Sequence, residues 1–141
     1  MVHDSTTSYS NERQDVWYEM SDLFLDTEFD EKARSHMANK LAMSPFSIDE
    51  LQTIMEDEVA PVLHVNLLCV AGQWGMFDRE TEVVQPIKLR LSAMGGNPAQ
   101  GWFPFLALKR RFFMFNVSNE WNQILQQVRK LRETESDSVS T

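Results

Sequence analysis

The carboxylates near the start of the chain are the side chains best placed to do chemistry. Four of them, Asp15, Glu19, Asp22 and Asp26, are spaced by four, three and four residues. At about 100° per residue, this spacing places them within about 60° of one another on one face of a helix. Such an acidic row can be a solvated surface, or it can dock against a basic partner.

A second acidic group follows further along the chain. It consists of Asp49, Glu50, Glu56, Asp57 and Glu58. The last three are consecutive and fall near the C-terminal end of a predicted helix, where negative charge opposes the helix dipole. Binding of a partner or an ion is therefore favoured more strongly for this second group than for the first acidic row. A plain solvated surface is the alternative. We predict that both groups together form a partner-binding surface.

Carboxylates from two helices can also hold Mg²⁺. Helical nucleotide pyrophosphatases do so with paired E-x-x-E and E-x-x-D motifs. In this chain Glu19-x-x-Asp22 fits the pattern, and Glu12-x-x-Asp15 and Glu28-x-x-Glu31 have the same spacing. Such spacing alone is weak evidence in a chain this acidic. We predict no metal site and no cofactor, and keep a Mg²⁺-dependent helical phosphohydrolase as the alternative.

The histidines and the cysteine form no recognisable reactive motif. His3, His36 and His64 are isolated, and no P-loop, G-x-G-x-x-G or G-x-S-x-G is present. We interpret His64, which lies in an apolar run, as a hydrogen-bonded core histidine. Cys69 is the only cysteine, so the chain forms no internal disulfide, which favours a reducing compartment. We predict that the chain is not an enzyme.

Aromatic residues alternate with basic ones between residues 102 and 115, around Lys109-Arg110-Arg111. Such a pattern can bind single-stranded nucleic acid by stacking, but its helical spacing favours core packing. Phe103 and Phe113 fall off the main apolar face and are either interface anchors or a second buried side. A homodimer through this half is therefore an open alternative.

Charge is distributed unevenly along a chain of net charge −8. Residues 1–60 hold 14 Asp and Glu against four Lys and Arg, whereas residues 61–141 hold seven against nine. An acidic half repels nucleic acid and anionic lipid and attracts basic proteins. The longest apolar run, 59–71, is shorter than the roughly 20 residues of a membrane span. We expect a cytoplasmic protein that binds neither membrane nor nucleic acid.

Apolar residues recur at helical spacing along most of the chain. This predicts helices over about 12–26, 30–42, 47–58, 61–71, 105–115 and 118–132. Ser47 and Glu50 form a capping-box pattern, and Pro61 suits the first turn of a separate, central helix. The segment 80–92 is ambiguous between strand and helix, and we predict a helix. The fold class is all-α, a compact bundle of six or seven helices in one domain at 11–132, with disordered tails at 1–10 and 133–141.

Two stretches carry a family resemblance. They are Trp17-x-x-x-Ser21-Asp22-Leu23-Phe24-Leu25-Asp26-Thr27-Glu28 and Asp57-Glu58-Val59-Ala60-Pro61-Val62-Leu63, continuing through Asn66-Leu67-Leu68. Together they resemble a family of small, stand-alone bacterial domains of unknown function over about residues 12–92. The resemblance implies no enzymatic activity. It also implies structural roles for the matched acids, which include Asp22, Asp26, Asp57 and Glu58 but neither Asp15 nor Glu19.

Small acidic bacterial domains are often immunity proteins, and we draw the functional expectation from that analogy of size and charge. The chain is expected to bind a cognate toxin or effector and to neutralise it by steric occlusion. Its acidic face would cover a basic, substrate-binding cleft of the toxin, with carboxylates replacing phosphate contacts. A non-enzymatic adaptor or regulator is the further alternative.

Overall fold

The computed structural model describes residues 9–25, 29–68, 76–93, 113–115 and 117–139, and every regular element among them is helical. The predicted all-α single domain is confirmed. In chain order the elements are α1 (Asn11–Ser21), the 3₁₀ turn η1 (Asp22–Phe24), α2 (Glu31–Met43), α3 (Ile48–Thr53), the π-helix η2 (Ile54–Val59), α4 (Ala60–Leu68), the π-helix η3 (Arg79–Val84), α5 (Gln85–Ala93) and α7 (Ser118–Val139).

Several of these elements join end to end. α3, η2 and α4 form one continuous rod, and η3 runs directly into α5. The described residues therefore build five helical rods, slightly fewer than the six or seven predicted. The predicted helix at 105–115 falls largely outside the described residues.

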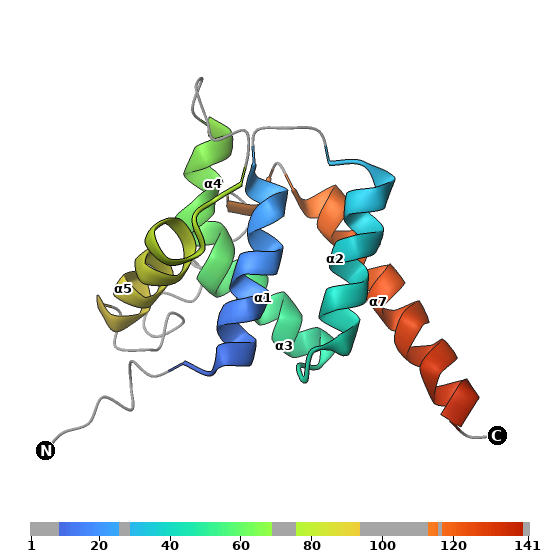
Figure 1. Cartoon of the computed structure of the whole chain (residues 1–141). Coiled ribbons are helices and arrows are strands. Elements are labelled where there is room, and N and C mark those ends of the chain that lie inside the picture. The colour runs from blue at the N-terminus through green and yellow to red at the C-terminus, as the bar shows by residue number, and fades with distance from the viewer. Residues whose placement is uncertain (1–8, 26–28, 69–75, 94–112, 116, 140–141) are drawn as a thin grey trace, which may run out of the picture.

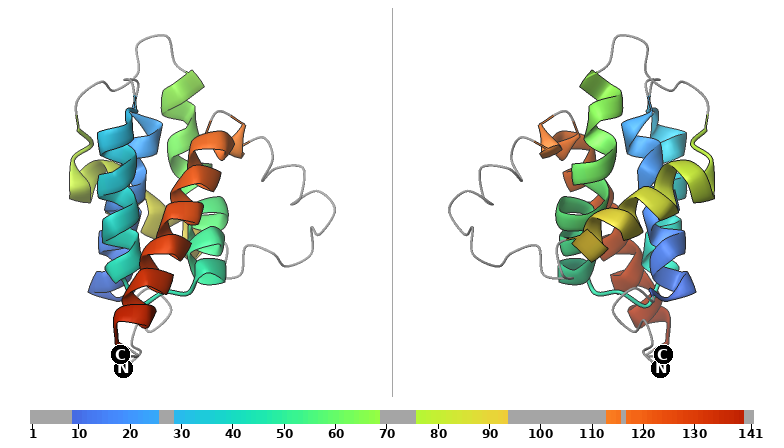
Figure 2. Two further views of the ribbon diagram at one scale, coloured as in Figure 1. Left: turned by 90° about the vertical axis from the view of Figure 1, so that its right-hand side faces the viewer. Right: turned by 90° about the vertical axis from the view of Figure 1, so that its left-hand side faces the viewer.

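α1 occupies the middle of the molecule (Figure 1). It packs against α2 on one side, against η3 on the other, and against η2 of the long rod behind it. α7 packs along α2, and α5 crosses the other helices obliquely (Figure 2). This arrangement brings the start of α1, the end of α2 and the start of α3 together at the lower end of the molecule in Figure 1.

The core is built from the apolar faces that helical spacing predicts. α1 and η1 bury Val16, Trp17, Met20, Leu23 and Phe24, and α7 buries Trp121, Ile124, Leu125 and Val128. Full burial of one such large side chain is worth about 1.5–3 kcal/mol. In the ambiguous segment Ile87 and Leu91 are buried whereas Leu89 is 73% exposed. A strand would place all three on one face, so this pattern confirms the helix.

Side-chain caps begin four of the helical segments. Ser10, Asp30 and Asp78 each accept a hydrogen bond from the backbone N–H three residues later, and Ser47 forms the predicted capping box with Glu50. Each cap satisfies one of the N–H groups that a helix start leaves without a partner. The caps therefore fix where these helices enter the bundle.

The two π-helices share one local feature, a proline directly after the wide turn. In the first, Ala60 N–H donates to the Met55 carbonyl, five residues back, and Pro61 follows. In the second, Gln85 N–H donates to the Glu80 carbonyl and Pro86 follows. A proline has no N–H to donate and its ring crowds the carbonyl four residues back, and a wider turn relieves that crowding. Pro61 lies in the first turn of α4, as predicted, but α4 continues directly from η2 and is not a separate rod.

Two predicted helix ends also differ from the structure. α1 stops at Ser21, short of the predicted residue 26, because the chain tightens into η1 and then extends at Leu25. α7 continues to Val139, so residues 133–139 are helical where a disordered tail was predicted. No glycine or proline interrupts that stretch, and its two Glu residues are good helix formers. Among the described residues no helix has both the length and the apolarity that crossing a membrane requires.

Candidate functional site

A surface groove of 380 Å³ runs beside α1 where α2 ends. Val16 and Leu41 give it an apolar floor, and Met43, 82% exposed, stands at its rim. We call this feature the α1–α2 groove. It combines an apolar base with charged walls, which is the usual make-up of a recognition site.

Three carboxylates of α1 line this groove: Glu12, Asp15 and Glu19. Asp15 and Glu19 were predicted from the acidic row, and the structure brings them together. Glu12 was missed, although its position three residues before Asp15 extends the same helical spacing towards the N-terminus. The acidic row therefore contributes to the groove through its first half.

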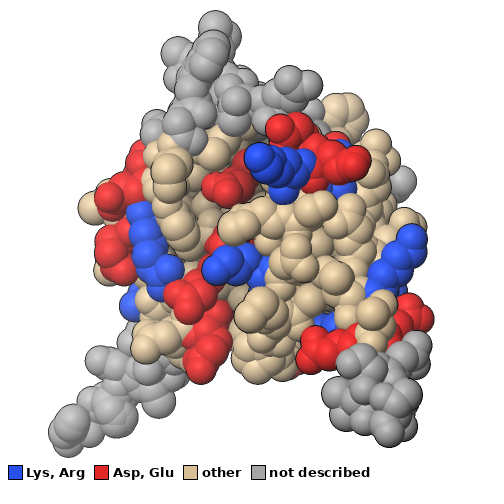
Figure 3. All heavy atoms as spheres, turned by 45° about the vertical axis from the view of Figure 1, so that its right-hand side comes forward, with Lys and Arg blue, Asp and Glu red and all other residues tan. Residues whose placement is uncertain are grey.

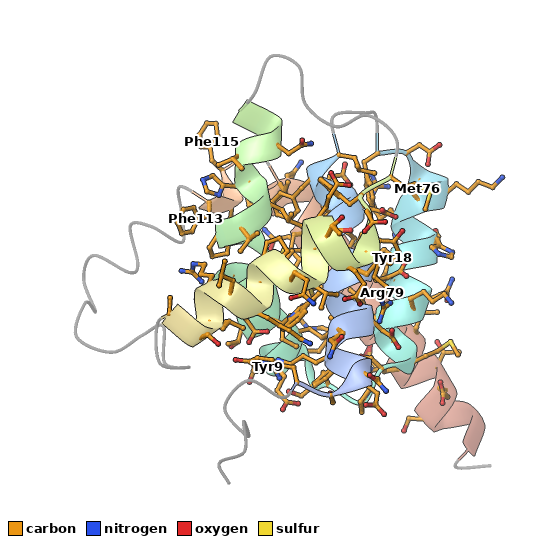
Figure 4. All side chains as sticks on the ribbon, turned by 60° about the vertical axis from the view of Figure 1, so that its left-hand side comes forward. Tyr9, Tyr18, Met76, Arg79, Phe113 and Phe115 are labelled. Atoms are coloured by element: carbon orange, nitrogen blue, oxygen red, sulfur yellow. The ribbon has the colours of Figure 1, made fainter. Side chains whose placement is uncertain are left out.

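Asp15 forms an ion pair across the groove wall with Arg79 of η3, with 2.6 Å between Oδ1 and Nη2. The Arg79 guanidinium also lies over the Tyr18 ring, 5.8 Å from its centroid. Figure 4 shows Tyr18 and Arg79 next to each other beside α1. Both partners of the ion pair are exposed, at 65% for Asp15 and 38% for Arg79, so the pair is worth only about 0–1 kcal/mol.

The second half of the acidic row lies in a different environment. Glu19 Oε1 lies 3.4 Å from Nε2 of His36 on α2, and Asp22 sits half-buried in η1. Burial raises the pKa of both carboxyls above their usual values, and nearby His36 opposes that rise. Asp26 lies outside the described residues. The single row of four predicted on one helix face is therefore not observed, because α1 ends before Asp22.

Glu58, by contrast, is buried inside the bundle at 7% exposure. It accepts hydrogen bonds from Arg13 Nε at 3.0 Å and from Trp17 Nε1 at 2.8 Å, and pairs with Arg13 Nη2 as well. This pairing raises the pKa of the Arg13 guanidinium. Glu58 therefore ties η2 to α1 and offers almost no surface to a partner.

Asp57 is also buried, and its backbone carbonyl accepts a hydrogen bond from Arg90 Nη1 at 2.8 Å. In a regular α-helix this carbonyl would accept from residue 61, but Pro61 has no N–H. Arg90 of α5 supplies the donor instead, and burial lowers its pKa. The two proline-containing rods are thus joined by a hydrogen bond at the carbonyl that lies four residues before Pro61.

The remaining predicted acids lie at the surface or near it. Glu56 is half-buried and accepts from Gln52 one turn earlier. Asp49 and Glu50 are exposed in the first turn of α3, where Glu50 completes the capping box. Acids suit this position because a helix N-terminus carries partial positive charge.

The end of the molecule that bears the α1–α2 groove carries more acidic than basic side chains, although Lys40 and Arg79 also line the groove. Arg13 pairs with Glu58, and Arg132 of α7 donates to the carbonyls of Leu41, Ala42 and Ser44 at the end of α2. We call the exposed acids of this region the groove-end acids: Glu12, Asp15, Asp49 and Glu50. Figure 3 shows that, over the face it displays, acidic and basic side chains are interleaved with broad uncharged areas.

The other side chains singled out from the sequence lie away from this groove. His64 Nδ1 lies 3.0 Å from the Ala60 carbonyl, and its ring packs 4.5 Å from that of Phe113. Phe103, Cys69 and the basic triplet 109–111 lie outside the described residues. Within the described part of the chain, no three His, Cys, Asp or Glu side chains are grouped so that they could hold a metal ion.

The model of one family, described as a domain of unknown function (DUF7079), matches residues 11–127, so the chain belongs to that family. The match continues past residue 92, where the resemblance was expected to end, and includes the first half of α7. No curated protein and no solved structure matches the chain.

Proposed function

We propose that this DUF7079 domain is a bacterial immunity protein, which binds a cognate toxin in the cytoplasm and covers its basic substrate cleft. One observation supports this most directly. At the groove end, Glu12, Asp15, Asp49 and Glu50 are exposed while Arg13 and Arg132 are engaged by internal hydrogen bonds. These acids outnumber Lys40 and Arg79, the basic residues that line the groove, so that end carries an excess of negative charge.

The proposed mechanism is occlusion guided by charge. An acidic surface attracts a basic protein during diffusion and orients it before contact. The groove then supplies an apolar base, with Met43 exposed at its rim, against which the partner can pack. A toxin that processes an anionic substrate presents the complementary basic cleft, and a bound protein blocks it without any chemical step.

Co-expression tests the function. The chain is expressed with the protein encoded next to it, one of the two carries a tag, and the pair is purified on that tag. We expect a stable complex and rescue of growth from the toxicity of the neighbour. A monomeric chain that neither retains nor protects against its neighbour would contradict the proposal.

Charge reversal then locates the surface. Glu12→Lys with Asp49→Lys changes two exposed first-turn acids at the groove end, for which no hydrogen bond or ion pair with other described residues is found. We expect association with the partner to slow by about tenfold at low salt, with a weaker salt dependence.

The matched control is Glu31→Lys with Glu133→Lys. Glu31 is an exposed first-turn acid at the start of α2, and Glu133 is exposed on α7. Net charge changes equally in both variants, so only position differs. Equal slowing in the two would show that net charge, and not the groove end, guides the encounter.

A further inference from the structure

We propose that the α1–α2 groove takes an arginine side chain of the partner protein, which bonds to Asp15 in place of Arg79. This inference rests on the proposed function and names the chemistry by which the partner is recognised. The occupant is a segment of the partner in which an arginine adjoins apolar residues.

The groove already holds a guanidinium, and this is the first observation behind the proposal. Arg79 bonds to the Asp15 carboxylate at 2.6 Å, and its guanidinium lies over the Tyr18 ring. A carboxylate beside an aromatic face is the combination that recognises arginine, through charge-assisted hydrogen bonds and the cation–π attraction. An arginine from outside would find the same two contacts.

The second observation is that the resident contact is easily exchanged. Asp15 is 65% exposed and Arg79 is 38% exposed, so water screens their attraction. A partner that binds elsewhere on the groove end can displace Arg79 at little cost, because the displaced guanidinium returns to solvent. The Asp15–Arg79 pair thus acts as an intramolecular competitor for the site.

The third observation is the surroundings of Asp15. Glu12 lies on the same groove and makes no hydrogen bond or ion pair with the described residues. Val16 and Leu41 form the apolar floor on which the methylene stem of an arginine can pack. Lysine matches this site less well, because its compact ammonium lacks the planar fork that pairs with a carboxylate and stacks on a ring.

The test uses N-acetylarginine methylamide as a probe, titrated into the ¹⁵N-labelled full chain. The lysine and leucine analogues serve as controls for charge and for apolar contact. We expect amide shifts confined to the groove, at residues 12–19, 40–44 and 79. Arginine should bind more tightly than lysine, and leucine should cause no saturating change. Absence of shifts in α1 up to the solubility limit of the probe would overturn the proposal.

Two variants distinguish displacement of Arg79 by the probe from a simple contact of the probe with the groove. Asp15→Asn is expected to abolish the arginine-specific shifts. Arg79→Met is expected to tighten probe binding several-fold, because it removes the competitor and leaves Asp15 available. Weaker binding in Arg79→Met would show that Arg79 itself contacts the ligand and would overturn the exchange.

The same two variants are then measured in the complex with the co-purified partner. We expect Asp15→Asn to speed dissociation at least several-fold and Arg79→Met to slow it. If the complex forms and neither variant changes its dissociation, the partner binds outside this groove, and the inference fails while the immunity function stands. If no complex forms at all, the proposed function fails first.

Discussion

Two arginine–carboxylate pairs tie α1 to its neighbours, and each reaches a π-helix. Arg13 pairs with Glu58 of η2, and Asp15 pairs with Arg79 of η3. The first pair is largely buried, and Trp17 donates a further hydrogen bond to Glu58. The second pair is exposed, and its guanidinium lies over the ring of Tyr18. The same kind of ion pair thus stabilises the fold on one side of α1, whereas on the other side it forms a contact that a partner can replace.

The largest expected effect comes from the buried pair. Glu58→Ala leaves Arg13 and the Trp17 indole N–H without their acceptor inside the bundle, so we expect a loss of about 3 kcal/mol in the free energy of unfolding. Urea denaturation measures it. Glu58→Gln is the matched control, because its amide oxygen still accepts from Trp17, and we expect it to lose less. A loss below about 0.5 kcal/mol for the alanine variant would mean that the pair is as weak as an exposed one.

A smaller effect is expected where the two proline-containing rods meet. Arg90→Met removes the donor to the Asp57 carbonyl, which Pro61 cannot replace. We expect a loss of about 1–2 kcal/mol, the usual contribution of a hydrogen bond from a charged donor. Lys88→Met on the same helix, for which no hydrogen bond or ion pair is found within the described structure, is the control for losing a positive charge. Equal losses in both would assign the effect to net charge.

The exposed pair is expected to matter little for stability. Asp15→Asn, Arg79→Met and the double variant should each change the free energy of unfolding by less than about 0.5 kcal/mol. A double-mutant cycle in urea measures the coupling. Coupling above about 1 kcal/mol would show that this pair is structural, like the buried one, and would remove the basis for its exchange with a partner.

The smallest effect is expected from Glu19 and Asp22, whose pKa values are raised by burial. A carboxyl with a raised pKa in the folded state holds its proton to higher pH than in the unfolded chain. The folded state therefore loses stability as pH rises through that interval.

The double variant Glu19→Gln with Asp22→Asn has neither of these titrating carboxyls, so it should not lose stability in this way as the pH rises. We expect the variant to exceed the parent in stability at pH 7, and the difference to vanish below about pH 3, where the carboxyls are protonated in both states. Urea midpoints across this range measure it. A difference that stays constant with pH would assign it to packing.

Much of the fold follows from local pattern. The spacing of Val16, Met20 and Phe24 identifies a buried helical face, and Ser47 with Glu50 identifies a helix start. Both depend on neighbours within one or two turns, so the sequence alone contains the necessary information.

The candidate site was predicted only in part, because its contacts join distant segments. Asp15 and Glu19 follow from spacing, but Arg79 and Met43 reach the groove through packing that no local pattern reveals. Glu58 was predicted to lie on a partner-binding surface because its local sequence is acidic. Its actual partner, Arg13, lies 45 residues away in the sequence. The family resemblance gave the better indication here, since it implied structural roles for Asp57 and Glu58, and both are buried.

The π-helix η2 lets the two halves of one continuous rod pack against different helices. Before it, α3 contacts α7, and after it, α4 contacts η1 and α5. One extra residue in a turn rotates everything that follows by about 100° around the helix axis. The wide turn therefore changes the phase of the rod at mid-length, so that Leu51 and Leu63 both face the core although different helices surround them. Deletion of a single residue between 54 and 59 would turn Leu63 towards solvent and would return Pro61 to a regular helical turn, where its ring crowds the carbonyl four residues back.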